Sequence, residues 1–123
     1  MNSRPKTIIC DIDGTILHHH GKGLDGQVLE NVKVLPGTIE KFREWDSLGY
    51  NIILITGRKE SLRDITLKQL RETGLYFDHL IMGVGGGERV LINDMKPGSS
   101  KDTAHAINLV RNEGLTQVKI EYY

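Results

Sequence analysis

The chain has 123 residues, and 16 basic and 16 acidic side chains give it a formal net charge of zero. This length predicts a single domain over residues 1–123 with a modest core. Neutral charge without a long basic run gives no support for nucleic acid or a membrane surface as partner. The longest apolar runs, such as 52–55, are too short to span a bilayer.

Cys10 is the only cysteine, so no disulfide can form within the chain. That fits a reducing compartment, and no apolar run of signal-peptide length follows residues 1–6. We therefore expect a cytoplasmic location. Cys10 itself lies inside an apolar run, where it is expected to pack as a small hydrophobe.

The periodicity predicts strands and helices that alternate along the chain. Strands are expected at 7–12, 51–56, 79–83, 89–93 and, as an edge strand, at 117–122, and helices at 38–48, 62–73 and 99–113. Residues 17–35 have weak periodicity and are expected to form an irregular flap. Near-continuous apolar strands between helices predict an α/β fold, a three-layer α/β/α Rossmann-like domain around a central parallel sheet.

Two carboxylates one residue apart end the first predicted strand. Because side chains alternate along a strand, Asp11 and Asp13 are expected on the same side. Like charges placed there are costly unless a cation or a shared proton offsets them, and Mg²⁺ prefers such oxygen ligands. Gly14 then allows a sharp turn. The alternative is an ordinary strand that ends in an Asp-Gly turn.

Polar residues also follow two later strands. Thr56, Gly57 and Arg58 come after the strand 51–56, and Asn93 and Asp94 end the strand 89–93. Ligands of open parallel sheets bind outside the carboxyl ends of the strands. We therefore expect all three clusters to meet at one edge of the sheet.

These residues resemble the motifs of the haloacid dehalogenase-like superfamily of phosphatases. The segment from Asp11 to Thr15 is similar to the first motif, Thr56-Gly57 to the second, and Asn93-Asp94 to the acidic fourth. The resemblance covers nearly the whole chain in order and spacing. No room remains between the motifs for a folded cap domain, so it implies a small capless member.

The resemblance also implies a role for each residue. Asp11 would be the nucleophile that forms an aspartyl-phosphate, and Asp13 would be the general acid and then the base. Mg²⁺ would be held by a carboxylate oxygen of Asp11, the backbone carbonyl of Asp13 and the carboxylate of Asp94. The Thr56 hydroxyl and the Gly57 N–H would hold phosphoryl oxygens.

One part departs from the family pattern, because no lysine lies between residues 79 and 94. Arg89 is the only cation there and the closest equivalent of the usual motif lysine, although it begins a predicted strand. Arg58 and Lys96 are further candidates for phosphate or substrate contacts. The fourth motif also has Asn93 where a second acid is common.

The histidines at 18–20 cannot all face one ion in regular structure, so a solvated loop is favoured over a metal site. Their position after the first motif leaves a contact with the leaving group of a substrate open. An open, capless site would admit a large substrate or be covered by a neighbouring subunit, and we expect a homo-oligomer.

The pattern as a whole predicts a Mg²⁺-dependent phosphomonoesterase. By family habit its substrate is expected to be a sugar phosphate or related small metabolite of carbohydrate or capsule precursor metabolism. Nucleic-acid 3′-phosphatase activity stays open, and neutral charge argues mildly against it. The rival hypotheses are a catalytically weak or inactive phosphate-binding or regulatory module, and a receiver-like phosphoacceptor domain.

Overall fold

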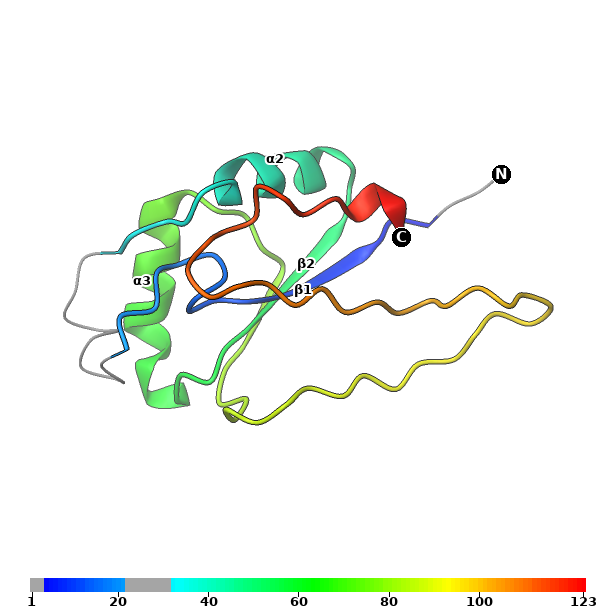
Figure 1. Cartoon of the computed structure of the whole chain (residues 1–123). Coiled ribbons are helices and arrows are strands. Elements are labelled where there is room, and N and C mark those ends of the chain that lie inside the picture. Colours follow the sequence, from blue (N-terminus) through cyan, green and yellow to red (C-terminus); the bar gives the residue numbers. More distant parts are fainter. Residues whose placement is uncertain (1–3, 22–31) are drawn as a thin grey trace.

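The computed structural model describes residues 4–21 and 32–123. They form a parallel sheet of three strands in the order β1 (Thr7–Asp11), β2 (Asn51–Ile55) and β3 (His79–Ile81). Helix α2 (Thr38–Ser47) connects β1 to β2, and α3 (Arg63–Thr73) connects β2 to β3 after the short 3-10 helix η1 (Glu60–Leu62) (Figure 1). A second 3-10 helix, η2 (Ile120–Tyr122), lies near the C-terminus.

Strands β1 and β2 end at the same level of the sheet. Asp11 is opposite Ile55 in the parallel register, so the residues that follow each strand leave the same edge. One face of β2 is tightly packed, because Ile52 and Leu54, which alternation places on the same side of the strand, are fully buried. This register brings the first and second sequence motifs together.

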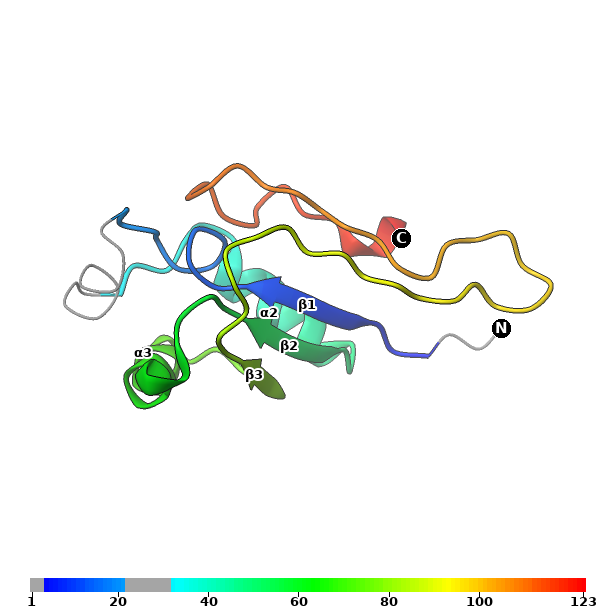
Figure 2. The same ribbon diagram turned by 90° about the horizontal axis from the view of Figure 1, so that it is seen from below.

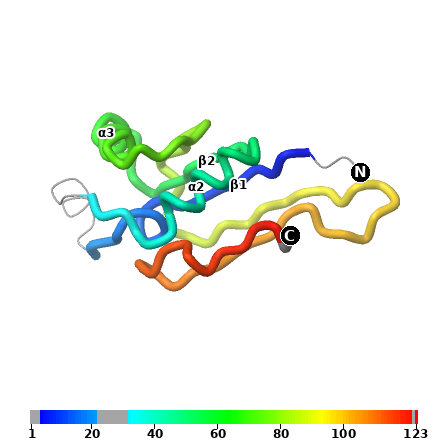
Figure 3. The backbone as a smooth tube through the Cα atoms, turned by 90° about the horizontal axis from the view of Figure 1, so that it is seen from above, coloured from blue at the N-terminus to red at the C-terminus, as the bar shows by residue number. Residues whose placement is uncertain are grey.

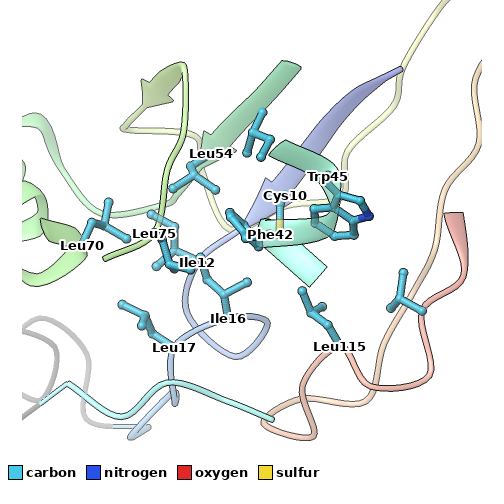
Figure 4. Packing of buried hydrophobic residues seen from close by; sticks show 12 residues of the cluster. Cys10, Ile12, Ile16, Leu17, Phe42, Trp45, Leu54, Leu70, Leu75 and Leu115 are labelled. Atoms are coloured by element: carbon cyan, nitrogen blue, oxygen red, sulfur yellow. The ribbon is translucent and has the colours of Figure 1, made fainter. Parts of the chain in front are cut away.

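Helix α2 covers one face of β1 and β2. It lies above the strands in Figure 1 and behind them in the view from below in Figure 2. Its inner side carries Phe42 and Trp45, whose ring centroids are 5.3 Å apart. These rings pack into one cluster of buried residues (Figure 4): Cys10, Ile12, Ile16, Leu17, Phe42, Trp45, Ile52, Leu54, Leu70, Leu75, Leu115 and Val118. Burial raises the pKa of the Cys10 thiol to about 12.

The C-terminal part returns to the body and closes the core. Leu115 donates a backbone hydrogen bond to the Pro36 oxygen at 2.8 Å and is itself buried. Gly114 has φ +85°, and a Cβ there would lie 2.2 Å from the Pro36 oxygen, so only glycine fits this approach. The turn before α2 is thereby tied to the end of the chain.

The sequence-based expectations fail after β3. Residues 83–119 contain no helix or strand, so the strand 89–93, the helix 99–113 and the edge strand 117–122 are wrong as predicted. Figures 1 and 3 show this part leaving the body as a long extended excursion and returning along it. Val90 and Ile92 are 84% and 90% exposed. An apolar run favours burial, but it forms a strand only where a neighbouring backbone offers ladder partners.

The fold class is confirmed as α/β with a parallel sheet, and the described residues include no cap domain. Of the predicted flap 17–35, residues 22–31 lie outside the described part. Its two ends form an antiparallel bridge between Leu17 and Val34. In residues 4–21 and 32–123, no helix is long and apolar enough to cross a membrane.

A matched pair of isoleucines tests the exposed excursion. We expect Ile92→Ala to change the free energy of unfolding by less than about 0.5 kcal/mol, because the side chain is solvated. Ile52→Ala should cost about 2–5 kcal/mol, because it empties a filled site in the core. Urea denaturation of both variants measures this. Equal losses would show that residues 89–93 form a buried strand.

Candidate active site

Asp11 is the last residue of β1 and is partly buried at the carboxyl edge of the sheet. A tight turn follows, in which the Ile12 oxygen accepts hydrogen bonds from the backbone of Ile16 and Leu17 at 3.0 and 3.1 Å. The turn brings Thr15 back to the strand, where its hydroxyl donates to Oδ2 of Asp11 at 3.3 Å. The carboxylate is therefore oriented by its own loop.

The end of β2 lies beside it. The Thr56 side chain is buried, and its Oγ1 accepts the backbone N–H of Arg58 at 3.1 Å. Gly57 is exposed, and a Cβ there would meet the Val84 oxygen at 3.1 Å. The Gly57 N–H has no hydrogen-bond partner in the described part of the chain, which leaves it free to donate to an anion.

An ion pair joins the two motifs. Arg58 donates from Nε to Oδ2 of Asp13 at 2.9 Å and from Nη2 to Oδ1 at 2.8 Å. Both side chains are nearly buried, at 3% and 10% exposure. The remaining nitrogen, Nη1, donates to Oγ1 of Thr66 at 3.0 Å and to Oε1 of Gln69 at 2.6 Å, both on α3. Arg58 thus connects β1, β2 and α3.

The pKa of the Asp11 carboxyl lies above its ordinary value of 3.8. Burial is the main cause, and the nearby Asp13 carboxylate adds to it. A hydrogen bond from the Ile12 backbone, the positive charge of Arg89 and the Thr15 hydroxyl oppose the rise. Asp11 is therefore a carboxylate kept partly out of water.

The structure gathers some of the predicted site residues and not others. Arg89 lies near enough to Asp11 to act on its charge, although its own Nη1 donates to the Gly87 oxygen. Asp94 and Lys96 are exposed in the extended excursion, where the Thr103 hydroxyl donates to the Asp94 backbone oxygen. Their predicted roles as metal ligand and substrate contact are not assembled here and stay predictions.

The predicted magnesium site is only partly present. No group of three or more histidine, cysteine, aspartate or glutamate side chains is placed to hold a metal within residues 4–21 and 32–123. Asp11 supplies one suitable carboxylate, but Asp94, the other predicted carboxylate ligand, is exposed in the extended excursion. The described residues therefore fit a magnesium ion incompletely.

Sequence reasoning missed two groups of residues. Thr66 and Gln69 are polar residues three apart on one face of α3, and this spacing on the buried side was the signal for an inward partner. Asn112 contacts the turn after Asp13 from 93 residues away. No local sequence pattern predicts a contact between residues that far apart in the chain.

A model of the polynucleotide kinase PNKP phosphatase domain matches residues 5–86. The chain belongs to this family. It is a phosphatase domain of the haloacid dehalogenase-like superfamily, so the resemblance seen in the sequence is confirmed. The matched range includes Asp11, Asp13 and Thr56 and ends before Arg89.

Solved structures show the same fold. A Pnkp1/Rnl/Hen1 complex contains a chain that is 25% identical with a TM-score of 0.58, over 73% of this chain and 32% of that chain. A chain of a Pnkp1/Rnl/Hen1 RNA repair complex is 26% identical with a TM-score of 0.56, over 63% of this chain and 25% of that chain. The chain in a crystal structure from Vibrio cholerae is 22% identical with a TM-score of 0.52, over 72% of this chain and 79% of that chain. This likeness supports the fold alone. The phosphatase-family chain thus spans about a third or less of the first two relatives.

The buried ion pair makes a prediction about stability. Arg58→Ala should lower the free energy of unfolding by about 3–5 kcal/mol, because it leaves the Asp13 carboxylate buried without its partner. Arg63→Ala is the matched control, since Arg63 forms a solvent-exposed pair with Glu60, and its loss should lower the free energy of unfolding far less. Urea denaturation compares the two. Similar costs would contradict the structural role of Arg58.

The raised pKa of Asp11 can be measured directly. We expect NMR titration of its side-chain carboxyl to give a pKa above 3.8, and Arg89→Gln to move the pKa further upward because an opposing positive charge is lost. Since the folded-state pKa is raised, the carboxyl stabilises the fold below 3.8, and that contribution is lost as pH rises through the raised value. Asp11→Asn should remove this pH dependence. A pKa at or below 3.8 would refute it.

Proposed function

We propose that this phosphatase domain is a phosphomonoesterase that uses Asp11 as its nucleophile. A carboxylate oxygen of Asp11 would form a bond to phosphorus while the ester P–O bond breaks, and water would then release phosphate and restore the carboxylate. The observation that carries the proposal is the position of Asp11, which lies partly buried at the carboxyl end of β1 with its orientation fixed by Thr15.

Asp13 is proposed as the acid that protonates the leaving oxygen and as the base for the second step. Arg58 holds both oxygens of the Asp13 carboxylate and so fixes its orientation. The same geometry argues that Arg58 acts through Asp13 rather than on the substrate. One of its two hydrogen bonds to Asp13 must open before Asp13 can reach a leaving group.

The phosphoryl oxygens are proposed to bind at the end of β2. The free N–H of Gly57 is the main donor, and the Thr56 hydroxyl, whose oxygen already accepts from Arg58, retains its own proton to donate. The positive charge of Arg89 opposes the rise in the pKa of Asp11, which supports Arg89 as the substitute for the motif lysine.

Mg²⁺ is proposed as the cofactor, with Asp11 as a protein ligand. Bound there, the ion would lower the repulsion between the carboxylate and an anionic phosphate. The backbone carbonyl of Asp13 and the carboxylate of Asp94 complete the proposed ligand set. Support from the structure is limited to Asp11, because Asp94 lies in the exposed excursion.

Two substrate classes are compatible with a site that has no cap among its described residues. The match to a polynucleotide kinase phosphatase domain and the likeness to chains of an RNA repair complex favour a phosphate at the end of a polynucleotide. A sugar phosphate or related metabolite of carbohydrate or capsule precursor metabolism is the second candidate, favoured by the net charge of zero. We place the polynucleotide end first.

The cellular setting remains at the level of proposal. A single domain over residues 1–123 is proposed from the length of the chain, and a cytoplasmic location from the lone, buried cysteine. A homo-oligomer is proposed from the open site. Oligomerisation would cover the open site and the exposed apolar run. Sedimentation at micromolar concentration tests it, and a monomer would refute it.

Phosphate release tests the function. We expect turnover of 3′-phosphorylated oligonucleotides, sugar phosphates or p-nitrophenyl phosphate that requires Mg²⁺ and stops with a chelator. Asp11→Asn should lower kcat by at least about 10³-fold, and Asp13→Asn by about 10²–10⁴-fold, because they remove the nucleophile and the general acid.

Asp64→Asn is the control, because Asp64 is an exposed carboxylate at the start of α3 and should leave kcat unchanged. Turnover that survives in Asp11→Asn would refute the nucleophile. Phosphate binding without turnover on any ester would favour the inactive binding module. Stable phosphorylation of the protein without release would favour a receiver-like domain.

A further inference from the structure

Asn112 holds the turn that follows Asp13 by three hydrogen bonds. Its backbone N–H donates to the Gly14 oxygen at 2.8 Å. Its side-chain Oδ1 accepts the backbone N–H of His19 at 2.7 Å, and its Nδ2 donates to the His19 oxygen at 3.0 Å. Both ends of the turn, residues 14 and 19, are therefore fixed by one residue from the C-terminal part of the chain.

The side-chain amide takes the place of a strand neighbour. It offers one acceptor and one donor to the N–H and C=O of His19, as a peptide group would in a sheet. The contact recognises backbone alone and does not depend on the histidine ring. It also satisfies the polar backbone groups of His19.

The backbone of Asn112 is as specific as its side chain. Its φ of 67° is left-handed, and within the described part of the chain it is the only residue other than glycine with a positive φ. Asparagine tolerates this region better than other residues with a side chain. Glycine would keep the conformation and lose the amide, and alanine would lose both.

The turn that Asn112 holds also carries the partner of the nucleophile. Thr15 lies one residue after Gly14, and its hydroxyl donates to Oδ2 of Asp11. Arg111, the neighbour of Asn112, also packs against the turn. A Cβ added to Gly14 would lie 3.1 Å from the Cγ of Arg111. A shift of Asn112 would release Gly14, then Thr15, and then the orientation of Asp11.

We propose that Asn112 is a positioning residue for the phosphatase reaction, acting on Asp11 through the turn 14–19. This inference rests on the proposed function of Asp11 and extends it to a part of the chain beyond the range matched by the family model. Asn112 does not touch the reacting atoms. It fixes the geometry in which they meet.

Two measurements on Asn112→Gly test the proposal. Amide hydrogen exchange at His19 should speed up by about tenfold or more, because two hydrogen bonds are lost while φ is kept. With p-nitrophenyl phosphate, kcat should fall by about 10–100-fold with KM within about twofold, because a small misplacement of reacting groups slows chemistry more than binding.

Glu113→Gly is the matched control, since it introduces glycine at an exposed neighbour whose own contact is a backbone bond to Val110. It should match the wild type in both measurements. Asn112→Asp supplies a second variant if Asn112→Gly fails to fold. It keeps the acceptor, but its other oxygen faces the His19 carbonyl without a proton, so faster exchange and a lower kcat are again expected.

Unchanged exchange at His19 in the folded variants would overturn the hold on the turn. Faster exchange with an unchanged kcat would overturn the positioning role and leave a structural one. A rise in KM with an unchanged kcat would also overturn it, because substrate binding would then be the step affected. If the wild type showed no turnover, the proposed function itself would be refuted. The hydrogen-exchange data would still decide whether Asn112 holds the turn.

Discussion

The buried pair between Arg58 and Asp13 is the interaction on which the site depends. Arg58 follows β2 and is 4% exposed, and its guanidinium contacts both Asp13 after β1 and helix α3. Removing an arginine from water is costly, and only a full set of acceptors offsets that cost. Asp13, Thr66 and Gln69 provide them. The parallel register of β1 and β2 brings these groups within reach, so sheet and site depend on the same contact.

The first half of the fold follows from local pattern. The apolar strand before Asp11 and the stripe of Phe42 and Trp45 are placed as periodicity predicts, because burial decides those positions. The run at 90–92 has the same kind of pattern and fails, because a strand also needs a neighbouring backbone. An apolar run shows that its residues favour burial. Whether the run forms a strand depends on whether the rest of the chain places another strand beside it.

The site divides in the same way. The positions of Asp11, Asp13 and Thr56 follow from the order of motifs and the rule that ligands lie at the carboxyl ends of parallel strands. The partner of Arg58 could not be predicted in this way. An arginine after Thr56-Gly57 suggests a phosphate contact, whereas the structure buries it against Asp13. Asn112 is the least predictable residue. Its side chain contacts the backbone of His19, and no pattern in the sequence indicates such a contact.

The protonated state of Cys10 has a consequence for oxidative stress. Its sulfur is buried one residue from Asp11, donates to the Asp11 backbone oxygen, and has a pKa of about 12. Oxidants and alkylating agents attack the thiolate, which is nearly absent at neutral pH under these conditions. The proposed phosphoryl transfer through the Asp11 carboxylate would therefore use a nucleophile that these reagents do not attack, although a sulfur lies next to it.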